Sequence, residues 1–114
     1  MTKSSTVYLH HILDCISRIR SFTADVDEQA FLKNFLIQDA VIRNFEVIGE
    51  AVKKVDSAIR RKYPDIPWKN IAGMRDKLIH DYMGVDVQAV WGVVEDILPN
   101  FEQQIKEIIG SLEQ

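Results

Sequence analysis

Three side chains suited to chemistry on phosphate lie close together in this sequence: Arg75, His80 and Tyr82. The imidazole of His80 can give or take a proton near neutral pH, which suits general acid–base catalysis. The guanidinium of Arg75 stays cationic and can hold a phosphate through two N–H donors. Apolar Leu78 and Ile79 lie within the same run, so one side of it should be buried. This stretch is therefore the candidate site of the chain.

Each of these residues also has a structural explanation. Arg75 could pair with Asp76, Asp81 or Glu50, and Tyr82 could be a half-buried core aromatic. A lone histidine near the end of a helix is commonly a cap or a hydrogen-bonding core residue. The residue types and their spacing therefore leave the catalytic and the structural interpretation both open.

A helix that ends near Gly84 is expected to carry the stretch. With 100° per residue, Arg75 and Tyr82 share one face of that helix, whereas Asp76 and His80 share another. The arginine and the histidine are then about 140° apart around the axis. Bending of the long arginine side chain, loosening of the helix near its end, or the meeting of two copies in a homodimer could bring them together.

The elements that must position this stretch are predicted to be helices. Apolar residues recur three or four positions apart, and no run alternates as a strand requires. The expected elements are a helix over 7–21, a short apolar turn over 31–36, a long helix over 38–55, a helix over 57–63, a turn over 69–71, the helix of 75–82, a helix over 87–97 and, after a break at 98–100, a last helix over 101–112. The pattern predicts an all-α, compact bundle of about five substantial helices in a single domain, 1–114.

Particular residues are expected to fix the ends and contacts of these helices. The candidate N-caps are Thr6, Asp25 or Asp27, Asp56 and Asp86. Gly49 lies inside the long helix, where glycine costs about 1 kcal/mol relative to alanine. It is therefore predicted to mark a close helix approach, which would bring Glu50 near another backbone or chain. Trp68 follows two prolines and is expected to anchor their loop to the core.

The composition limits what the chain can do. Cys15 is the only cysteine, so no intramolecular disulfide can form, and no Cys, His and carboxylate cluster has the spacing of metal ligands. We therefore expect no metal and no cofactor. No apolar run approaches the roughly 18 residues of a membrane helix, and no signal-peptide core follows the polar residues 1–6. A reducing cytoplasm fits these features.

Charge is unevenly distributed along the chain. The net charge of −3 argues weakly against a nucleic-acid partner. Residues 53–77, however, contain eight basic and three acidic side chains, whereas residues 78–114 contain one basic and seven acidic. A local positive patch can attract a polyanion despite a negative total, although basic helix faces are also often merely solvated. The basic residues are Lys53, Lys54, Arg60, Arg61, Lys62, Lys69, Arg75 and Lys77.

The spacing of Arg75, His80 and Tyr82, Arg-x4-His-x-Tyr, resembles the signature of the HepT-like toxins of the HEPN superfamily. Two flanking segments resemble the same family. Residues 41–51, VIRNFEVIGEA, are similar to its long-helix segment, and residues 66–75, IPWKNIAGMR, are similar to its approach to the active site. Together these segments extend the resemblance over most of the chain.

The resemblance implies a helical bundle that forms a homodimer and acts as a metal-independent endoribonuclease. Arg75 and His80 would be catalytic, with Asp76 and Glu50 in supporting positions. It also implies the toxin of a type VII toxin–antitoxin system, whose cognate antitoxin is a minimal nucleotidyltransferase. That antitoxin would neutralise the toxin by AMPylation, transferring AMP to Tyr82. The candidate RNA-binding residues are Lys53, Lys54, Lys69 and Lys77.

These roles are chemically consistent with the residues. One histidine cannot be acid and base in the same step, so a second His80 across a dimer axis would supply the missing partner. AMP on Tyr82 would add bulk and negative charge where RNA phosphate should bind. Two alternatives are a non-catalytic HEPN module, which binds nucleotide or RNA or serves as the helical partner of a nucleotidyltransferase, and a purely structural dimer module.

Overall fold

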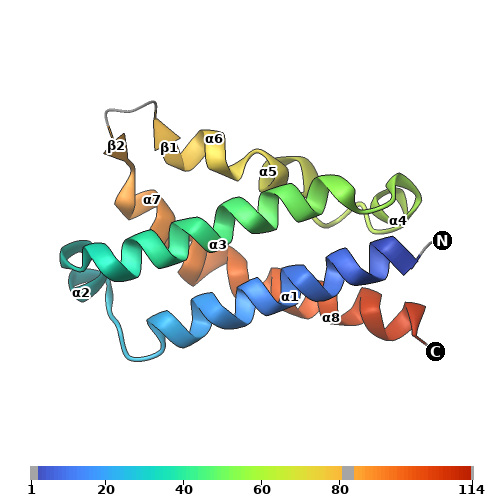
Figure 1. Cartoon of the computed structure of the whole chain (residues 1–114), viewed down its shortest axis with the longest axis horizontal. Helices are drawn as coiled ribbons and strands as arrows, with labels where there is room; N and C mark the ends of the chain where they lie inside the picture. The colour runs from blue at the N-terminus through green and yellow to red at the C-terminus, as the bar shows by residue number, and fades with distance from the viewer. Residues whose placement is uncertain (1–2, 81–83, 114) are drawn as a thin grey trace.

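The frame of the molecule consists of three long helices, α1 (Lys3–Thr23), α3 (Phe35–Lys54) and α8 (Leu98–Leu112). The computed structural model describes residues 3–80 and 84–113. In it, α1 packs along both α3 and α8 (Figure 1). The molecule measures 43 × 30 × 21 Å, so it is elongated in the direction of these helices.

The other elements are short. They are α2 (Glu28–Lys33), α4 (Ser57–Lys62), α5 (Trp68–Ala72), α6 (Met74–Leu78), the two-residue strands β1 (Ile79–His80) and β2 (Gly84–Val85), α7 (Val87–Gly92) and the π-helical segment η2 (Val93–Ile97). In Figure 1, α4, α5 and α6 follow one another along one edge of the molecule, from the end that holds α4 towards the end that holds the strands. Both α5 and α6 pack on α3.

Apolar stripes hold the frame together, because the helical period places them on one face of each long helix. The fully or almost fully buried apolar side chains of α1 are Leu9, Ile12, Cys15, Ile16 and Ile19. Those of α3 are Val41, Phe45, Ile48, Ala51 and Val52, and those of α8 include Phe101, Ile105 and Ile108. Phe31 of α2 contacts Trp91 of α7, with 5.1 Å between the ring centroids, so the short helices extend the same core.

The predicted all-α class is confirmed, although the ends of the long helices are shifted. The first helix begins at Lys3, so Thr6 lies inside α1 and is not its N-cap. The long helix begins at Phe35 rather than near residue 38. Its N-cap is Asn34, whose side chain accepts a hydrogen bond from the N–H of Ile37 at 3.0 Å. That cap allows the helix to start one turn earlier than the apolar stripe indicated.

Three of the predicted aspartate caps are confirmed. Each carboxylate accepts a hydrogen bond from a backbone N–H in the first turn of the helix that follows, at 2.8 to 3.0 Å. The capping residues are Asp27 before α2, Asp56 before α4 and Asp86 before α7. These caps satisfy N–H groups that a short helix would otherwise leave without a partner.

The predicted break at Pro99 is wrong. A proline inside a helix lacks an N–H, and its ring clashes with the carbonyl four residues earlier, which is that of Glu95. The chain widens into η2 just before the proline, and the N–H of Leu98 bonds to the carbonyl of Val93, five residues back. Pro99 then lies in the first turn of α8, where its missing N–H is tolerated. α7, η2 and α8 therefore follow one another without a loop.

Candidate active site

The candidate motif does not lie on one helix. Arg75 belongs to α6, which ends at Leu78, and His80 belongs to the strand β1. The predicted helix over 75–82 is therefore wrong, and with it the separation of about 140° that regular helical geometry gave for the arginine and the histidine. Tyr82 lies outside the described residues.

A short strand pair replaces the second part of the predicted helix. β1 pairs antiparallel with β2, with Ile79 opposite Val85 and His80 opposite Gly84. Ile79 and Val85 are β-branched, and residues of this type favour an extended backbone. Two residues are too few for an alternating pattern to be seen, so no strand could be predicted here. The backbone of His80 is thus held by β2 rather than by helical hydrogen bonds.

α5 holds the approach to the site against α3. Trp68 is buried, and its indole N–H donates to the carbonyl of Tyr63 at 3.0 Å, which confirms its predicted role as an anchor. The close approach predicted at Gly49 is also confirmed, because a Cβ on that residue would lie 3.2 Å from the carbonyl oxygen of Ala72. A single glycine then links α5 to α6, so the position of Arg75 depends on this contact.

The two supporting carboxylates are exposed. Asp76 lies in the first turn of α6. Glu50 lies on α3, where its Oε1 is 3.4 Å from the Nζ of Lys53. An exposed pair of this kind contributes at most about 1 kcal/mol, so it holds the carboxylate of Glu50 only weakly. Glu50 also lines two hollows on α3, with volumes of about 160 and 370 Å³.

The four predicted RNA-binding lysines are all exposed, but they lie on three helices. Lys53 and Lys54 end α3, Lys69 lies in α5 and Lys77 lies in α6. Three further cations that were not among the predicted contacts form the last turn of α4, at 60–62. Their signal in the sequence is a run of three consecutive basic residues just before a proline-rich turn.

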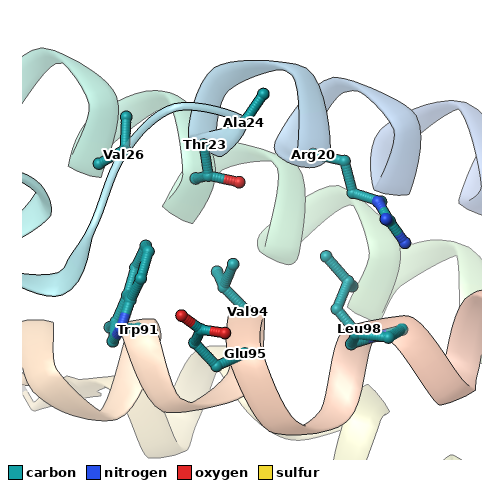
Figure 2. Close-up of a pocket in the computed structure, with 9 residues that line it drawn as sticks. Arg20, Thr23, Ala24, Val26, Trp91, Val94, Glu95 and Leu98 are labelled. Atoms are coloured by element: carbon teal, nitrogen blue, oxygen red, sulfur yellow. The ribbon is translucent and has the colours of Figure 1, made fainter.

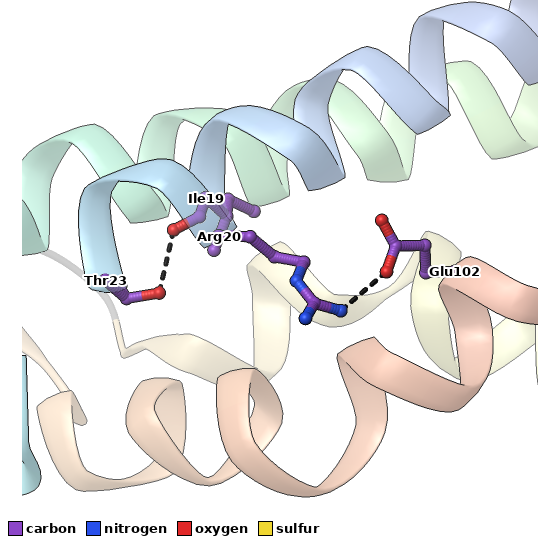
Figure 3. A network of polar contacts seen from close by, with 4 residues as sticks. All are labelled: Ile19, Arg20, Thr23 and Glu102. Atoms are coloured by element: carbon purple, nitrogen blue, oxygen red, sulfur yellow. Dashed lines mark hydrogen bonds and ion pairs between the residues drawn. The ribbon is translucent and has the colours of Figure 1, made fainter. Parts of the chain in front are cut away.

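A separate hollow of about 300 Å³ lies between the end of α1 and the segment α7–η2–α8 (Figure 2). Arg20 at its edge donates to Glu102 of α8, with 2.6 Å between Nη1 and Oε1, and the hydroxyl of Thr23 donates to the carbonyl of Ile19 at 2.8 Å (Figure 3). The motif residues and the four lysines are not among its described lining residues. The hollow is therefore a space between packed helices and not part of the candidate site.

The two other histidines lie on the surface of α1. The Nε2 of His10 is 2.8 Å from the Oε2 of Glu113, which links the first helix to the end of the last. His10 and His11 line a surface hollow of about 590 Å³ together with Thr6 and Asp14. Nothing in the sequence indicated this contact, because its partners are 103 residues apart.

Burial raises the pKa of the Cys15 thiol. Arg18 and Arg43 lower it in part, and Asp14 raises it further. A thiol buried among apolar side chains is a poor nucleophile, so Cys15 acts as a small core residue.

Among the described side chains of residues 3–80 and 84–113, no three His, Cys, Asp or Glu groups gather as metal ligands would. Within the same ranges, every helix is too short or too polar to cross a membrane.

Comparison with known proteins identifies the family of the chain. A family model described as Ribonuclease HepT-like matches residues 12–108. The chain is 49% identical over 107 residues to a Methanocaldococcus jannaschii protein named "Putative RNase", and the alignment covers 94% of this chain and 92% of that protein. It is 40% identical over 108 residues to "Probable ribonuclease HepT" of Thermococcus cleftensis, covering 95% and 98% of the two chains. No solved structure matches the chain. The chain therefore belongs to the family of HepT-like ribonucleases.

Proposed function

We propose that this protein is a metal-independent endoribonuclease and the toxin of a type VII toxin–antitoxin system. The observation that carries the proposal is the match to HepT-like ribonucleases, which runs from residue 12 to residue 108 and spans the whole motif. The ribonuclease names of two relatives support it. Arg75 and His80 are the catalytic residues in this proposal.

The chemistry needs three contributions at the cleaved bond. The 2′-hydroxyl of the ribose loses a proton and attacks the phosphorus, and the 5′-oxygen leaves and gains a proton. His80 can serve as the base or the acid in these transfers. Arg75 stays cationic and stabilises the charge that develops on the phosphate oxygens. In this proposal Asp76 and Glu50 are supporting groups. Asp76 follows Arg75 in the chain, and Glu50 lies on α3, against which α6 packs.

A homodimer would complete this site. A single imidazole cannot accept one proton and donate another in the same step, so His80 of a second copy supplies the missing group. Two Arg75/His80 pairs then face each other across the dimer axis. Sedimentation of the purified protein at micromolar concentration checks this: a dimer is expected, and a monomer alone would count against the composite site.

Control of the activity is assigned to Tyr82. A cognate nucleotidyltransferase antitoxin transfers AMP from ATP to the hydroxyl of Tyr82, which loses its proton as pyrophosphate leaves. Tyr82 is two residues from His80 in the chain. The added group carries bulk and negative charge, so it opposes the binding of RNA phosphate by sterics and by electrostatics. Mass spectrometry after co-expression with the antitoxin is expected to find AMP on this tyrosine.

Two substitutions test the catalytic assignment. His80→Ala and Arg75→Ala are each expected to lower RNA cleavage by a factor of about 10² or more, which is the usual contribution of a positioned acid or base and of a group that stabilises charge in the transition state. Circular dichroism should show an intact helical fold for both variants. Cleavage is measured in the presence of a chelator, because no metal is expected to take part. His11→Ala, on the surface of α1, is the matched control and should retain wild-type activity.

Two results would reject the proposal. If His80→Ala cleaves RNA as well as the wild type, the motif is not catalytic. If the wild type cleaves no RNA but binds a nucleotidyltransferase tightly, the protein is the non-catalytic helical module instead. Activity that is lost in chelator and restored by a divalent ion would overturn metal independence alone.

A further inference from the structure

Five cations gather at one corner of the molecule. Lys53 and Lys54 end α3, and Arg60, Arg61 and Lys62 form the last turn of α4. These five residues, termed the basic corner, lie within ten positions of the chain and are exposed, apart from the partly buried Arg60. In Figure 1 the corner occupies the end of the molecule opposite the strands of the candidate site.

Few carboxylates neutralise the basic corner. Lys53 pairs with Glu50 at 3.4 Å, and the four other cations form no ion pair with any residue of 3–80 or 84–113. Lys62 instead lies over the ring of Tyr63, with 5.9 Å from its Nζ to the ring centroid. Asp56, the acidic residue nearest in sequence, is engaged as the N-cap of α4. The corner therefore presents positive charge that is available to a ligand.

Negative charge lies on the other side of the molecule. Two helices separate α8 from α5 and α6, because α5 and α6 pack on α3, α3 packs on α1, and α1 packs on α8, while α7 contacts α6 directly. The exposed carboxylates of η2 and of the C-terminal segment are Glu95, Asp96, Glu107 and Glu113, against one lysine, Lys106. A polyanion is repelled from that side and attracted to the α4–α6 edge, so the charge distribution favours one orientation.

The basic corner and the motif lie towards opposite ends of the α4–α6 edge. The contact between Gly49 and Ala72 places the end of α5 against the C-terminal third of α3, and α6 continues from there towards the strands (Figure 1). Lys54 lies five residues beyond Gly49 in the other direction, about 7.5 Å along the helix axis, and α4 lies beyond it. A ligand that contacts both Arg75 and the last turn of α4 therefore extends along α5 and α6, as a polyanion with several phosphates would.

We propose that the basic corner binds phosphates of the RNA several nucleotides away from the cleaved bond. The substrate is then a polyribonucleotide that follows the α4–α6 edge, rather than a dinucleotide, with Lys69 between its two contact regions and Lys77 on α6 with Arg75. Basic grooves that follow one strand contact about 4–16 nucleotides. Because the cleaved bond is that of the proposed ribonuclease, this inference rests on the proposed function. Phosphate contacts carry no sequence information, so the corner sets affinity and length dependence.

A charge-neutralising double variant tests the corner. Arg61→Gln/Lys62→Gln removes two exposed charges from α4, and Lys33→Gln/Lys106→Gln is the matched control, which removes two exposed charges from α2 and α8. kcat/KM is measured for ribo-oligonucleotides from dinucleotides to chains of about 16 nucleotides. The wild type and the control should cleave long chains preferentially, and the corner variant should lose about tenfold in the ratio of long-chain to dinucleotide activity. For the corner variant, the slope of log kcat/KM against log salt concentration should become less steep by about 0.7 for each lost phosphate contact.

The outcomes separate this inference from the proposed function. A long-to-short ratio in the corner variant equal to that of the control would overturn the inference and leave the ribonuclease standing. If the wild type cleaves no RNA, the proposed function fails. The fluorescence anisotropy of a labelled RNA then tests whether the basic corner binds RNA. Weaker binding by the corner variant than by the control supports RNA binding at the corner, and equal binding overturns it. If polyglutamate binds as tightly as RNA, the basic corner is a site for an acidic protein, and the inference is overturned.

Discussion

The frame of α1, α3 and α8 and the edge of α4, α5 and α6 are held in place in different ways. The frame helices have 21, 20 and 15 residues, and each buries a continuous apolar stripe. The edge helices have six, five and five residues, which is too short for an isolated helix to persist in water. Among the side chains of these helices that the structure describes, the buried ones are Ile59, Trp68, Ile71 and Met74.

This difference separates stability from chemistry. The long helices bury most of the apolar surface, so the frame supplies most of the free energy of folding. The short helices take the position that their few contacts with α3 impose, and they carry the basic residues and Arg75. A change inside the frame should therefore alter stability alone, a change on the exposed edge should alter activity alone, and a change where the two regions meet should alter both.

The largest effect on stability is expected in the frame. Ile16 is completely buried in α1, so Ile16→Ala should lower the free energy of unfolding by about 2–5 kcal/mol. RNA cleavage per folded molecule should stay at the wild-type level. Urea unfolding followed by circular dichroism measures the first quantity, and cleavage under conditions where the variant is folded measures the second. Ile16→Val, with an expected cost of about 0.5–1.5 kcal/mol, serves if the alanine variant does not fold.

The control for this comparison lies on the same helix. Val7 is 63% exposed, so Val7→Ala should change the free energy of unfolding by no more than about 0.5 kcal/mol. If Ile16→Ala abolished cleavage while leaving stability unchanged, the separation between frame and edge would be wrong.

The same difference explains how much of the fold could be predicted from the sequence. Apolar stripes on α1, α3 and α8 run over several turns, so the helical period is visible and the long helices were placed to within about a turn. Asn34 was missed as a cap because it lies inside the segment 31–36, which was predicted to be an apolar turn. Pro99 was expected to end a helix. The π-helical turn that accommodates it could not be foreseen, because such a turn leaves no periodic signal in the sequence.

The edge could be predicted less well for a physical reason. α5, α6 and β1 have five, five and two residues, and their conformation is set by contacts with α3 and β2 rather than by local periodicity. Trp68 and Gly49 were identified because each stands out by itself, as an aromatic after prolines and as a glycine inside a helix. Arg75 and His80 were singled out by their spacing, but the backbone that carries His80 was assigned to the wrong element.

The next largest effect is expected where the two regions meet, at Gly49. In Gly49→Ala the new Cβ would lie 3.2 Å from the carbonyl oxygen of Ala72. This tight contact opposes a gain of about 1 kcal/mol in helix propensity, so the net change should be small. In Gly49→Val the two methyl groups should push α5 away from α3 and lower the free energy of unfolding by about 1–3 kcal/mol. RNA cleavage should fall as well, because α5 leads directly into α6 and Arg75.

A second helical glycine provides the control for Gly49. A Cβ added to Gly110 of α8 would meet no atom within 4 Å, so Gly110→Val should leave cleavage unchanged and should not destabilise the fold by overpacking. Thermal unfolding and RNA cleavage are measured for both valine variants. Equal behaviour of the two would show that the contact between α3 and α5 does not position the site.

The smallest effect is a pH dependence of the frame, and it comes from Cys15. The thiol is 1% exposed in α1, and burial raises its pKa in the folded protein. In the unfolded chain a thiol loses its proton near pH 8.5. Below that pH the contribution of Cys15 to stability is fully present. As the pH rises, the unfolded state gains from deprotonation first, so the contribution is lost until the pH passes the folded-state pKa. Urea unfolding between pH 7.5 and 9.5 should therefore show a steeper fall in stability for the wild type than for Cys15→Ala, because every other titrating group is common to both. Parallel curves would mean that the thiol is no harder to ionise in the frame than in the unfolded chain.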